Sequence, residues 1–193
     1  MVYITYFCAS DSKRNRADEN ALGRELLFAL YRKLYEKDPP SIKKAPLGKP
    51  YFEGIGEPQF NISHSGDAIA VVLSDAPYPV GIDVQASIEP YRAERVSKRF
   101  PFAKPRFLEP VSEYAFFKAE SFGGEFSFKR ETVAPTGTED FTDAWTLTEA
   151  LLKADGGGFT SSKELDEIEK RSKALCFKID GFSISVAEKS GFC

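Results

Sequence analysis

Three short β-strand patterns follow one another between residues 59 and 85, and they constrain the fold more than any other stretch of the sequence. Residues 59–63 and 68–74 carry the apolar and β-branched side chains typical of strands. A turn with two prolines separates them from a third pattern at residues 80–85. We therefore expect a small antiparallel sheet in this part of the chain.

The third of these patterns places polar side chains on one face of its strand. Successive side chains of a strand point to opposite faces, so Ile82 and Val84 share one face, and Asp83 and Gln85 share the other. The apolar face suits a hydrophobic core. The polar face must be solvated, paired or bound to a ligand.

Two long segments carry the apolar period of an amphipathic helix. The first spans about residues 18–36, has a leucine at every fourth position, and ends before two prolines. The second spans residues 140–154 and ends at three consecutive glycines. In the second helix Trp145, Glu149 and Lys153 recur every four residues, so they lie on one side.

Shorter patterns complete the expected elements. A strand is expected at residues 2–8, and Asp180-Gly181 between two apolar runs is a strong signal for a type I′ hairpin. The other expectations are a basic loop at residues 10–16, a loop at 42–48, helices at 91–100 and 161–171, and a helical continuation at 112–119. Residues 120–137 have no clean period and predict no element.

The composition is that of one globular domain, or of two small halves packed as one. The chain has 193 residues, and its net charge of −3 disfavours nucleic acid as a partner. Its longest apolar run, residues 68–73, is too short to span a membrane, and no signal-peptide pattern is expected. Three widely spaced cysteines suit free thiols in a reducing compartment, so a cytoplasmic location is expected.

Residues 92–106 form the one basic stretch of this acidic chain. They contain six Lys or Arg residues against a single acid, Glu94. A solvated helix face is one interpretation, because charge runs are usually solvated. A protein-interaction surface is the other.

Two carboxylates in these patterns are candidate metal ligands. Asp83 and Glu149 are hard oxygen donors, and Mg²⁺ prefers one or two carboxylates with water and phosphate oxygens in its other positions. The alternative for Glu149 is a helix-surface ion pair with Lys153, which has the favourable i, i+4 order. His64, the only histidine, is a phosphate donor or an ordinary hydrogen-bonded residue. Ser63 and Ser65 can equally be turn residues before the next strand.

Four short motifs stand in order along the chain. They are Gly48-Lys49-Pro50, Phe60-Asn61-Ile62-Ser63-His64-Ser65, Gly81-Ile82-Asp83-Val84-Gln85, and the stretch from Trp145 to Lys153 before a glycine-rich turn. Each motif alone is moderately specific. Together, in this order and at this spacing, they strongly resemble the 4′-phosphopantetheinyl transferase family in its single-chain, two-half form. The match extends from Gly48 to about Phe159.

The resemblance implies a fold and a reaction. The fold would be α+β, with residues 1–84 and 85–193 as similar halves in a pseudo-two-fold arrangement, each a long helix on a small antiparallel sheet. The site would lie between the halves. The reaction is Mg²⁺-dependent transfer of the phosphopantetheine arm of coenzyme A to a serine of an acyl or peptidyl carrier protein, which releases adenosine 3′,5′-bisphosphate. A monomer is implied, because one chain supplies both halves.

The resemblance also implies roles at the nucleotide. Lys49 would contact the 3′-phosphate of coenzyme A. Ser63 and His64 would line the nucleotide and diphosphate site, with His64 donating to a phosphate. Lys153 would neutralise charge on the transferring phosphate, since phosphoryl transfer depends on positioning and charge compensation.

The implied metal ligands are Asp83 and Glu149, with Gln85 as a third. Glu149 is also the candidate base for the serine hydroxyl. Gln85 stands where most members of the family have a glutamate, so weaker Mg²⁺ affinity is expected. Thr148 replaces the usual lysine before Glu149, which removes a cation–phosphate contact.

Two further interpretations remain open. The chain can be a coenzyme A-binding relative that has lost catalysis, or a protein-interaction module that uses residues 92–106. The segment between the two carboxylates is also longer than usual in the family. We place the extra chain at residues 119–139.

Overall fold

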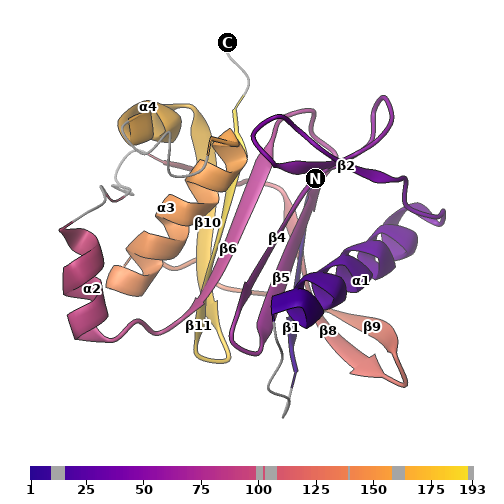
Figure 1. The fold of residues 1–193 in the computed structure, drawn as a ribbon, viewed down its shortest axis with the longest axis horizontal. Coiled ribbons are helices and arrows are strands. Elements are labelled where there is room, and N and C mark those ends of the chain that lie inside the picture. Colours follow the sequence, from indigo (N-terminus) through magenta and orange to yellow (C-terminus); the bar gives the residue numbers. More distant parts are fainter. Residues whose placement is uncertain (10–15, 99–101, 103–107, 139, 158–163, 191–193) are drawn as a thin grey trace.

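The computed structural model describes residues 1–9, 16–98, 102, 108–138, 140–157 and 164–190, which form a mixed α+β fold (Figure 1). Its helices are α1 (Arg16–Tyr35), α2 (Pro90–Ser97), α3 (Phe141–Asp155) and α4 (Leu165–Lys170). Its strands are β1 (Val2–Cys8), β2 (Ile42–Lys44), β3 (Pro50–Phe52), β4 (Gln59–Ser65), β5 (Ala68–Ser74), β6 (Val80–Ala86), β7 (Glu109–Pro110), β8 (Tyr114–Phe122), β9 (Glu125–Glu131), β10 (Ser172–Ile179) and β11 (Phe182–Lys189). The expected α+β class is confirmed. None of the helices described is both long and apolar enough to cross a membrane.

Two sheets contain most of the strands. The first has the order β4-β5-β1-β8-β9 and the second the order β6-β11-β10-β7, while β2 and β3 pair by themselves. Neighbouring strands are antiparallel except for β1 with β8 and β10 with β7, which are parallel. The expectation of purely antiparallel sheets was therefore wrong. Long connections along the chain allow these distant segments to pair in parallel.

The elements form layers around β5. α1 covers the outer face of the first sheet, α3 covers the second sheet, and the two sheets share an apolar core (Figure 1). Along β5, Ile69, Val71 and Leu73 contact the cluster that includes α1. Ala70 and Val72 contact the cluster between the sheets. β5 is therefore buried on both faces, which explains why its sequence is continuously apolar.

The predicted division between residues 84 and 85 falls inside β6. β6 begins before this division yet belongs to the second sheet, together with β10 and β11. β8 and β9 follow the division, yet they extend the first sheet beyond β1. Each sheet carries one long helix, but the sheets do not coincide with the two halves of the sequence.

Two local expectations were wrong. Residues 114–119, expected to be helical, lie in β8, where Phe116 and Phe117 enter the cores on opposite faces. β8 pairs with β1, and Thr5 Oγ1 donates to the carbonyl of Phe117 (3.1 Å). This distant pairing outweighs the local helical preference. The expected loop at residues 42–48 begins with β2, which pairs with β3.

The strongest local signals were confirmed. Asp180 and Gly181 have positive φ angles of 48° and 80° in the turn between β10 and β11, as a type I′ hairpin requires. α3 begins with a capping box between Asp140 and Asp143, and ends at Gly156 with φ 89°. The expected basic loop at residues 10–16 lies almost wholly outside the described residues, as do parts of the expected helices at 91–100 and 161–171.

Candidate functional site

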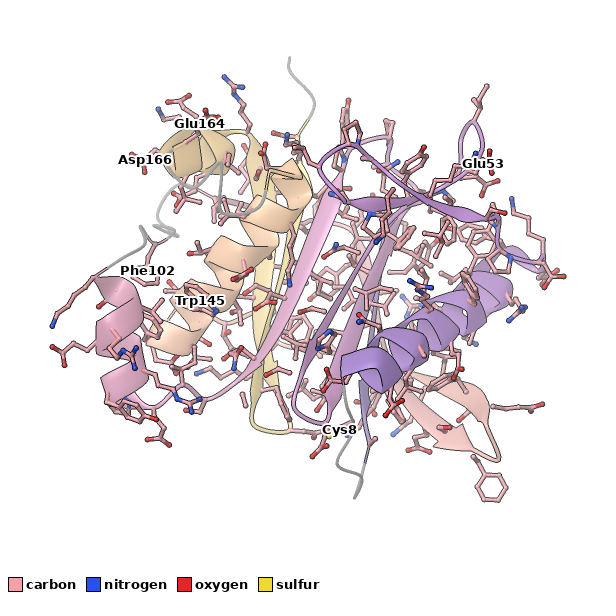
Figure 2. The ribbon with its side chains drawn as sticks, viewed as in Figure 1. Cys8, Glu53, Phe102, Trp145, Glu164 and Asp166 are labelled. Carbon is pink, nitrogen blue, oxygen red and sulfur yellow. The ribbon has the colours of Figure 1, made fainter. Side chains whose placement is uncertain are left out.

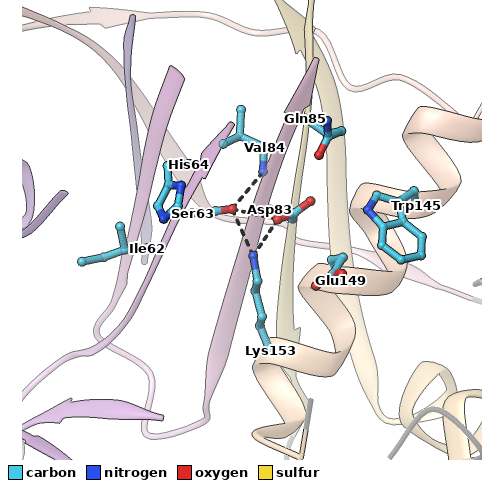
Figure 3. Close-up of a pocket in the computed structure, with 9 residues that line it drawn as sticks. All are labelled: Ile62, Ser63, His64, Asp83, Val84, Gln85, Trp145, Glu149 and Lys153. Carbon is cyan, nitrogen blue, oxygen red and sulfur yellow. Dashed lines mark hydrogen bonds and ion pairs between the residues drawn. The ribbon is translucent and has the colours of Figure 1, made fainter. Parts of the chain in front are cut away.

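One cavity of about 320 Å³ lies where β4, β6 and α3 meet (Figure 3). Each element contributes three of its lining residues. These are Ile62, Ser63 and His64 from β4, Asp83, Val84 and Gln85 from β6, and Trp145, Glu149 and Lys153 from α3. Every predicted site residue except Lys49 is among them.

β4 and β6 are joined by a ladder of side-chain hydrogen bonds. Three alternate backbone N–H groups of β6 donate to three alternate side chains of β4. The bonds run from Ile82 N to Asn61 Oδ1 (3.0 Å), from Val84 N to Ser63 Oγ (3.4 Å), and from Ala86 N to Ser65 Oγ (3.4 Å). The two serines are therefore strand residues and not turn residues. This ladder holds β4 and β6 in register across the seam between the sheets.

The close approach of α3 to β6 depends on Gly81. A Cβ atom at this position would lie 2.1 Å from the carbonyl oxygen of Ala150 and 2.4 Å from the amide nitrogen of Ala154. Any side chain would therefore push the helix away from the strand. Contact at Gly81 brings the C-terminal half of α3, with Glu149 and Lys153, onto the neighbouring Asp83.

Asp83 and Lys153 form an ion pair at the floor of the cavity. Lys153 Nζ donates to Asp83 Oδ1 (2.6 Å), and also to Ser63 Oγ (3.0 Å) and the carbonyl of Ile82 (3.2 Å). Ser63 Oγ in turn donates to Asp83 Oδ1 (2.7 Å). The lysine thus pairs with a carboxylate on β6 and not with Glu149, its i, i+4 neighbour.

Glu149 is the titratable group of the site whose pKa is most perturbed. Burial, the largest cause, and the negative charge of Asp83 together raise the pKa of this carboxyl to about 7, against the opposing effect of Lys153. Near neutral pH the group is therefore poised between its acid and its base form.

The donor set fits Mg²⁺. Asp83 uses Oδ1 for Lys153, and its other oxygen points away from the ammonium, toward the side of the cavity with Gln85, Trp145 and Glu149 (Figure 3). Two carboxylates that repel one another, with an amide oxygen beside them, match the ligands that Mg²⁺ takes with water and phosphate. The described residues contain no group of three or more His, Cys, Asp or Glu side chains that could hold a metal ion. Mg²⁺ commonly takes water and phosphate oxygens in the positions that carboxylates leave open.

His64 has a partner that the sequence did not indicate. Its Nδ1 lies 3.1 Å from Oε2 of Glu19, in the first turn of α1. Since Nδ1 faces this carboxylate, Nε2 is the nitrogen available to a ligand. No local motif links a helix residue to a strand residue so far along the chain, so only the packing of α1 on β4 reveals the pair.

Lys49 lies apart from the other predicted residues. It lines a neighbouring cavity of about 200 Å³, which shares Lys153 with the first. Its Nζ donates to the carbonyls of Lys153 (2.7 Å), Val80 (2.9 Å) and Ala154 (3.1 Å). Burial lowers the pKa of Lys49 to about 8, so the group is still mainly an ammonium at neutral pH. Its expected contact with a phosphate stays a prediction.

Thr148 does not line either cavity. It is buried, and its hydroxyl donates to the carbonyl of Ala144 (2.7 Å). Thr148 therefore lies on a buried side of α3, where its hydroxyl binds a backbone carbonyl one turn earlier in the same helix. The expected effect of losing a lysine here stays a prediction.

An aromatic group links the basic stretch to the cavity. Phe102 contacts Phe141 (centroids 5.0 Å apart) and Trp145 (6.2 Å), beside the first turns of α3 (Figure 2). α2 has no buried residue, and Lys98, which follows the helix, pairs with Glu94 (2.6 Å). Part of the stretch, including Arg99 and residues 103–107, lies outside the described residues.

The extra chain at residues 119–139 includes the end of β8 and all of β9, at the edge of the first sheet (Figure 1). None of its described residues lines the cavity.

Comparison of the chain with models of known protein families and with curated proteins finds no match.

Proposed function

We propose that this protein transfers 4′-phosphopantetheine from coenzyme A to a serine hydroxyl of an acyl or peptidyl carrier protein, with Mg²⁺ as cofactor. One observation carries the proposal. Six residues selected by motif alone, from three distant segments, line a single cavity: Ser63, His64, Asp83, Gln85, Glu149 and Lys153. A core hairpin and an unrelated helix would have no reason to bring these side chains together.

The carboxylates of the site would hold the metal. Asp83 and Glu149, with the Gln85 amide oxygen, are the described groups that can bind Mg²⁺ in this cavity. Bound there, the ion would supply charge neutralisation for a diphosphate. Lys153 adds a positive charge on the opposite side of Asp83, which also suits an anionic substrate.

Glu149 is the group best suited to take the acceptor proton. A general base must lie within reach of the proton that it takes, and Glu149 lines the same cavity as the residues proposed to hold the diphosphate. The serine oxygen would bond to the phosphorus that carries the pantetheine. The bond from that phosphorus to adenosine 3′,5′-bisphosphate would break, and the hydroxyl proton would pass to Glu149.

The fold and the surface support the same proposal. Each sheet carries one long helix, and the cavity lies at the seam between the sheets, where a transferase site built from two helix-and-sheet layers is proposed. A single chain supplies all three lining segments, so we propose a monomer working in the cytoplasm. Arg92 and Arg95 on exposed α2, with Lys98 directly after it, would steer an acidic carrier protein toward the cavity.

The deciding experiment is incubation with coenzyme A, Mg²⁺ and a panel of apo-carrier proteins, read by intact mass. Transfer adds about 340 Da, the mass of the phosphopantetheine group, to the carrier. An Asp83→Ala variant serves as the inactive control. Binding of coenzyme A without transfer would indicate a relative that has lost catalysis. If coenzyme A does not raise the unfolding temperature of the protein at all, the remaining interpretation is a protein-interaction module.

A further inference from the structure

We infer that the ammonium group of Lys49 has a structural role: its hydrogen bonds to backbone carbonyls hold the C-terminal end of α3 against the start of β6. This set of hydrogen bonds is called the pin below. Lys49 is a positioning residue for Lys153, and it does not bind a phosphate. The resemblance implies instead that Lys49 contacts the 3′-phosphate of coenzyme A. The two roles therefore predict different effects of replacing Lys49.

The hydrogen bonds of Lys49 are the first support for a pin. Two of its three carbonyl partners, Lys153 and Ala154, lie in the last turn of α3, and the third, Val80, is the first residue of β6. The last carbonyls of a helix have no partner within the helix, and they form the negative end of its dipole. An ammonium at this point therefore satisfies free acceptors and binds the helix to the strand.

The backbone around Lys49 holds the ammonium in place. The carbonyl of Lys49 accepts a hydrogen bond from Ala45 N (2.8 Å), which closes the turn between β2 and β3. The side chain then passes over Gly156, where a Cβ atom would lie 3.7 Å from the Lys49 Cδ. The stem is thus enclosed between the arm that carries it and the end of the helix.

The pin acts directly on the cavity. Lys49 holds the backbone carbonyl of Lys153, and the side chain of the same Lys153 reaches Asp83. Loss of the pin would free the last turn of α3 and so change the separation of these two charges. All three N–H donors of Lys49 are already used, so none remains for a phosphate without breaking this arrangement.

The first test rests on the proposed function and compares two donors, coenzyme A and 3′-dephospho-coenzyme A. If Lys49 only positions Lys153, kcat/KM of a Lys49→Met variant should fall by the same factor with coenzyme A and with 3′-dephospho-coenzyme A. We expect a factor of about ten to a hundred, because a catalytic group is then misplaced. The preference for coenzyme A over the dephospho form should then equal that of the wild type. Loss of that preference in the variant would overturn the inference.

The second test needs no enzymatic activity. Lys49→Ala should lower the unfolding temperature, and n-propylammonium should recover part of the loss by occupying the vacated site. Tetramethylammonium, which has the same charge but no N–H donor, should not. Lys44→Ala, an exposed lysine on the same arm, is the matched control and should unfold like the wild type.

An unchanged unfolding temperature, or equal effects of both ions, would contradict the pin even if the protein transferred phosphopantetheine as proposed. If Lys49→Ala does not fold, Lys49→Met and Lys49→Arg replace it. The guanidinium retains donors for the carbonyls, so Lys49→Arg should be the more stable of the two. The opposite order would overturn the inference.

Discussion

The ammonium of Lys153 lies 2.6 Å from Oδ1 of Asp83, although the two residues are 70 positions apart in the chain. The contact joins the last turns of α3 to the middle of β6, and it divides the charges of the site unequally. Asp83 receives the cation, whereas Glu149 is left with a carboxyl whose pKa is raised to about 7. The chemistry proposed for the cavity depends on this asymmetry.

The ion pair should be visible as a coupling energy. Asp83→Asn leaves the Lys153 ammonium without its carboxylate, and we expect a loss of about 1–3 kcal/mol, less than for a fully buried pair because Lys153 is partly exposed. Lys153→Met alone should also destabilise, while the double variant should recover part of the loss. Chemical denaturation of all four proteins measures the coupling, and strictly additive losses would argue against the pair. Either single variant should also abolish Mg²⁺-dependent transfer.

The Glu149 carboxyl should make the folded protein less stable as the pH rises. Its folded-state pKa is raised from 4.5 to about 7, so its contribution is fully present below 4.5 and is lost as the pH rises through about 7. Glu149→Gln removes this ionisation. We compare the two proteins in the presence of a chelator. At about pH 8 the variant should be about 1–2 kcal/mol more stable than the wild type, a figure reduced to allow for the partial solvation of Glu149. At about pH 4 the two proteins should be equally stable. Added Mg²⁺ should narrow the difference, and a pH-independent difference would contradict the assignment.

Gln85 should limit the affinity for the metal. Replacing its neutral amide by a carboxylate adds a negative ligand, so Gln85→Glu should lower the Mg²⁺ concentration that gives the half-maximal rate, by about tenfold. Gln59→Glu, on β4 outside the cavity, is the matched control. An unchanged requirement would mean that Gln85 is not a ligand.

Glu19 should set the tautomer of His64. Because the chain has a single histidine, its ring nitrogens can be assigned without ambiguity by ¹⁵N NMR. In the neutral ring of the wild type we expect the proton on Nδ1, facing Glu19. Glu19→Ala should move the population toward the Nε2–H form. Glu25→Ala, an exposed change on the same helix, should leave the tautomer population unchanged.

The basic stretch should act on only one of the two substrates. Reversing the charges of Arg95, Lys98 and Arg99 should raise KM for the carrier protein several-fold, more at low salt, and leave KM for coenzyme A unchanged. Reversal of Lys44, Lys129 and Arg130, three exposed basic residues outside this stretch, is the control with the same change in net charge. Equal effects on both substrates would exclude docking at this surface.

Several elements were predictable because their causes are local. The amphipathic period of α1, the caps of α3 and the Asp180-Gly181 turn each depend on neighbours within a few residues. β8 was not predictable in this way. Its strand conformation comes from pairing with β1, and its apolar residues suit a helix as well as a strand buried on both faces.

The site shows the same limit. The sequence alone determined which side chains face one way, since alternation along β6 and the four-residue period along α3 follow from backbone geometry. Only the tertiary structure decided their partners: Lys153 with Asp83, His64 with Glu19, and Lys49 with three carbonyls. Such pairings are set by how strand and helix pack, down to the missing Cβ of Gly81, and no spacing along the chain encodes those distances.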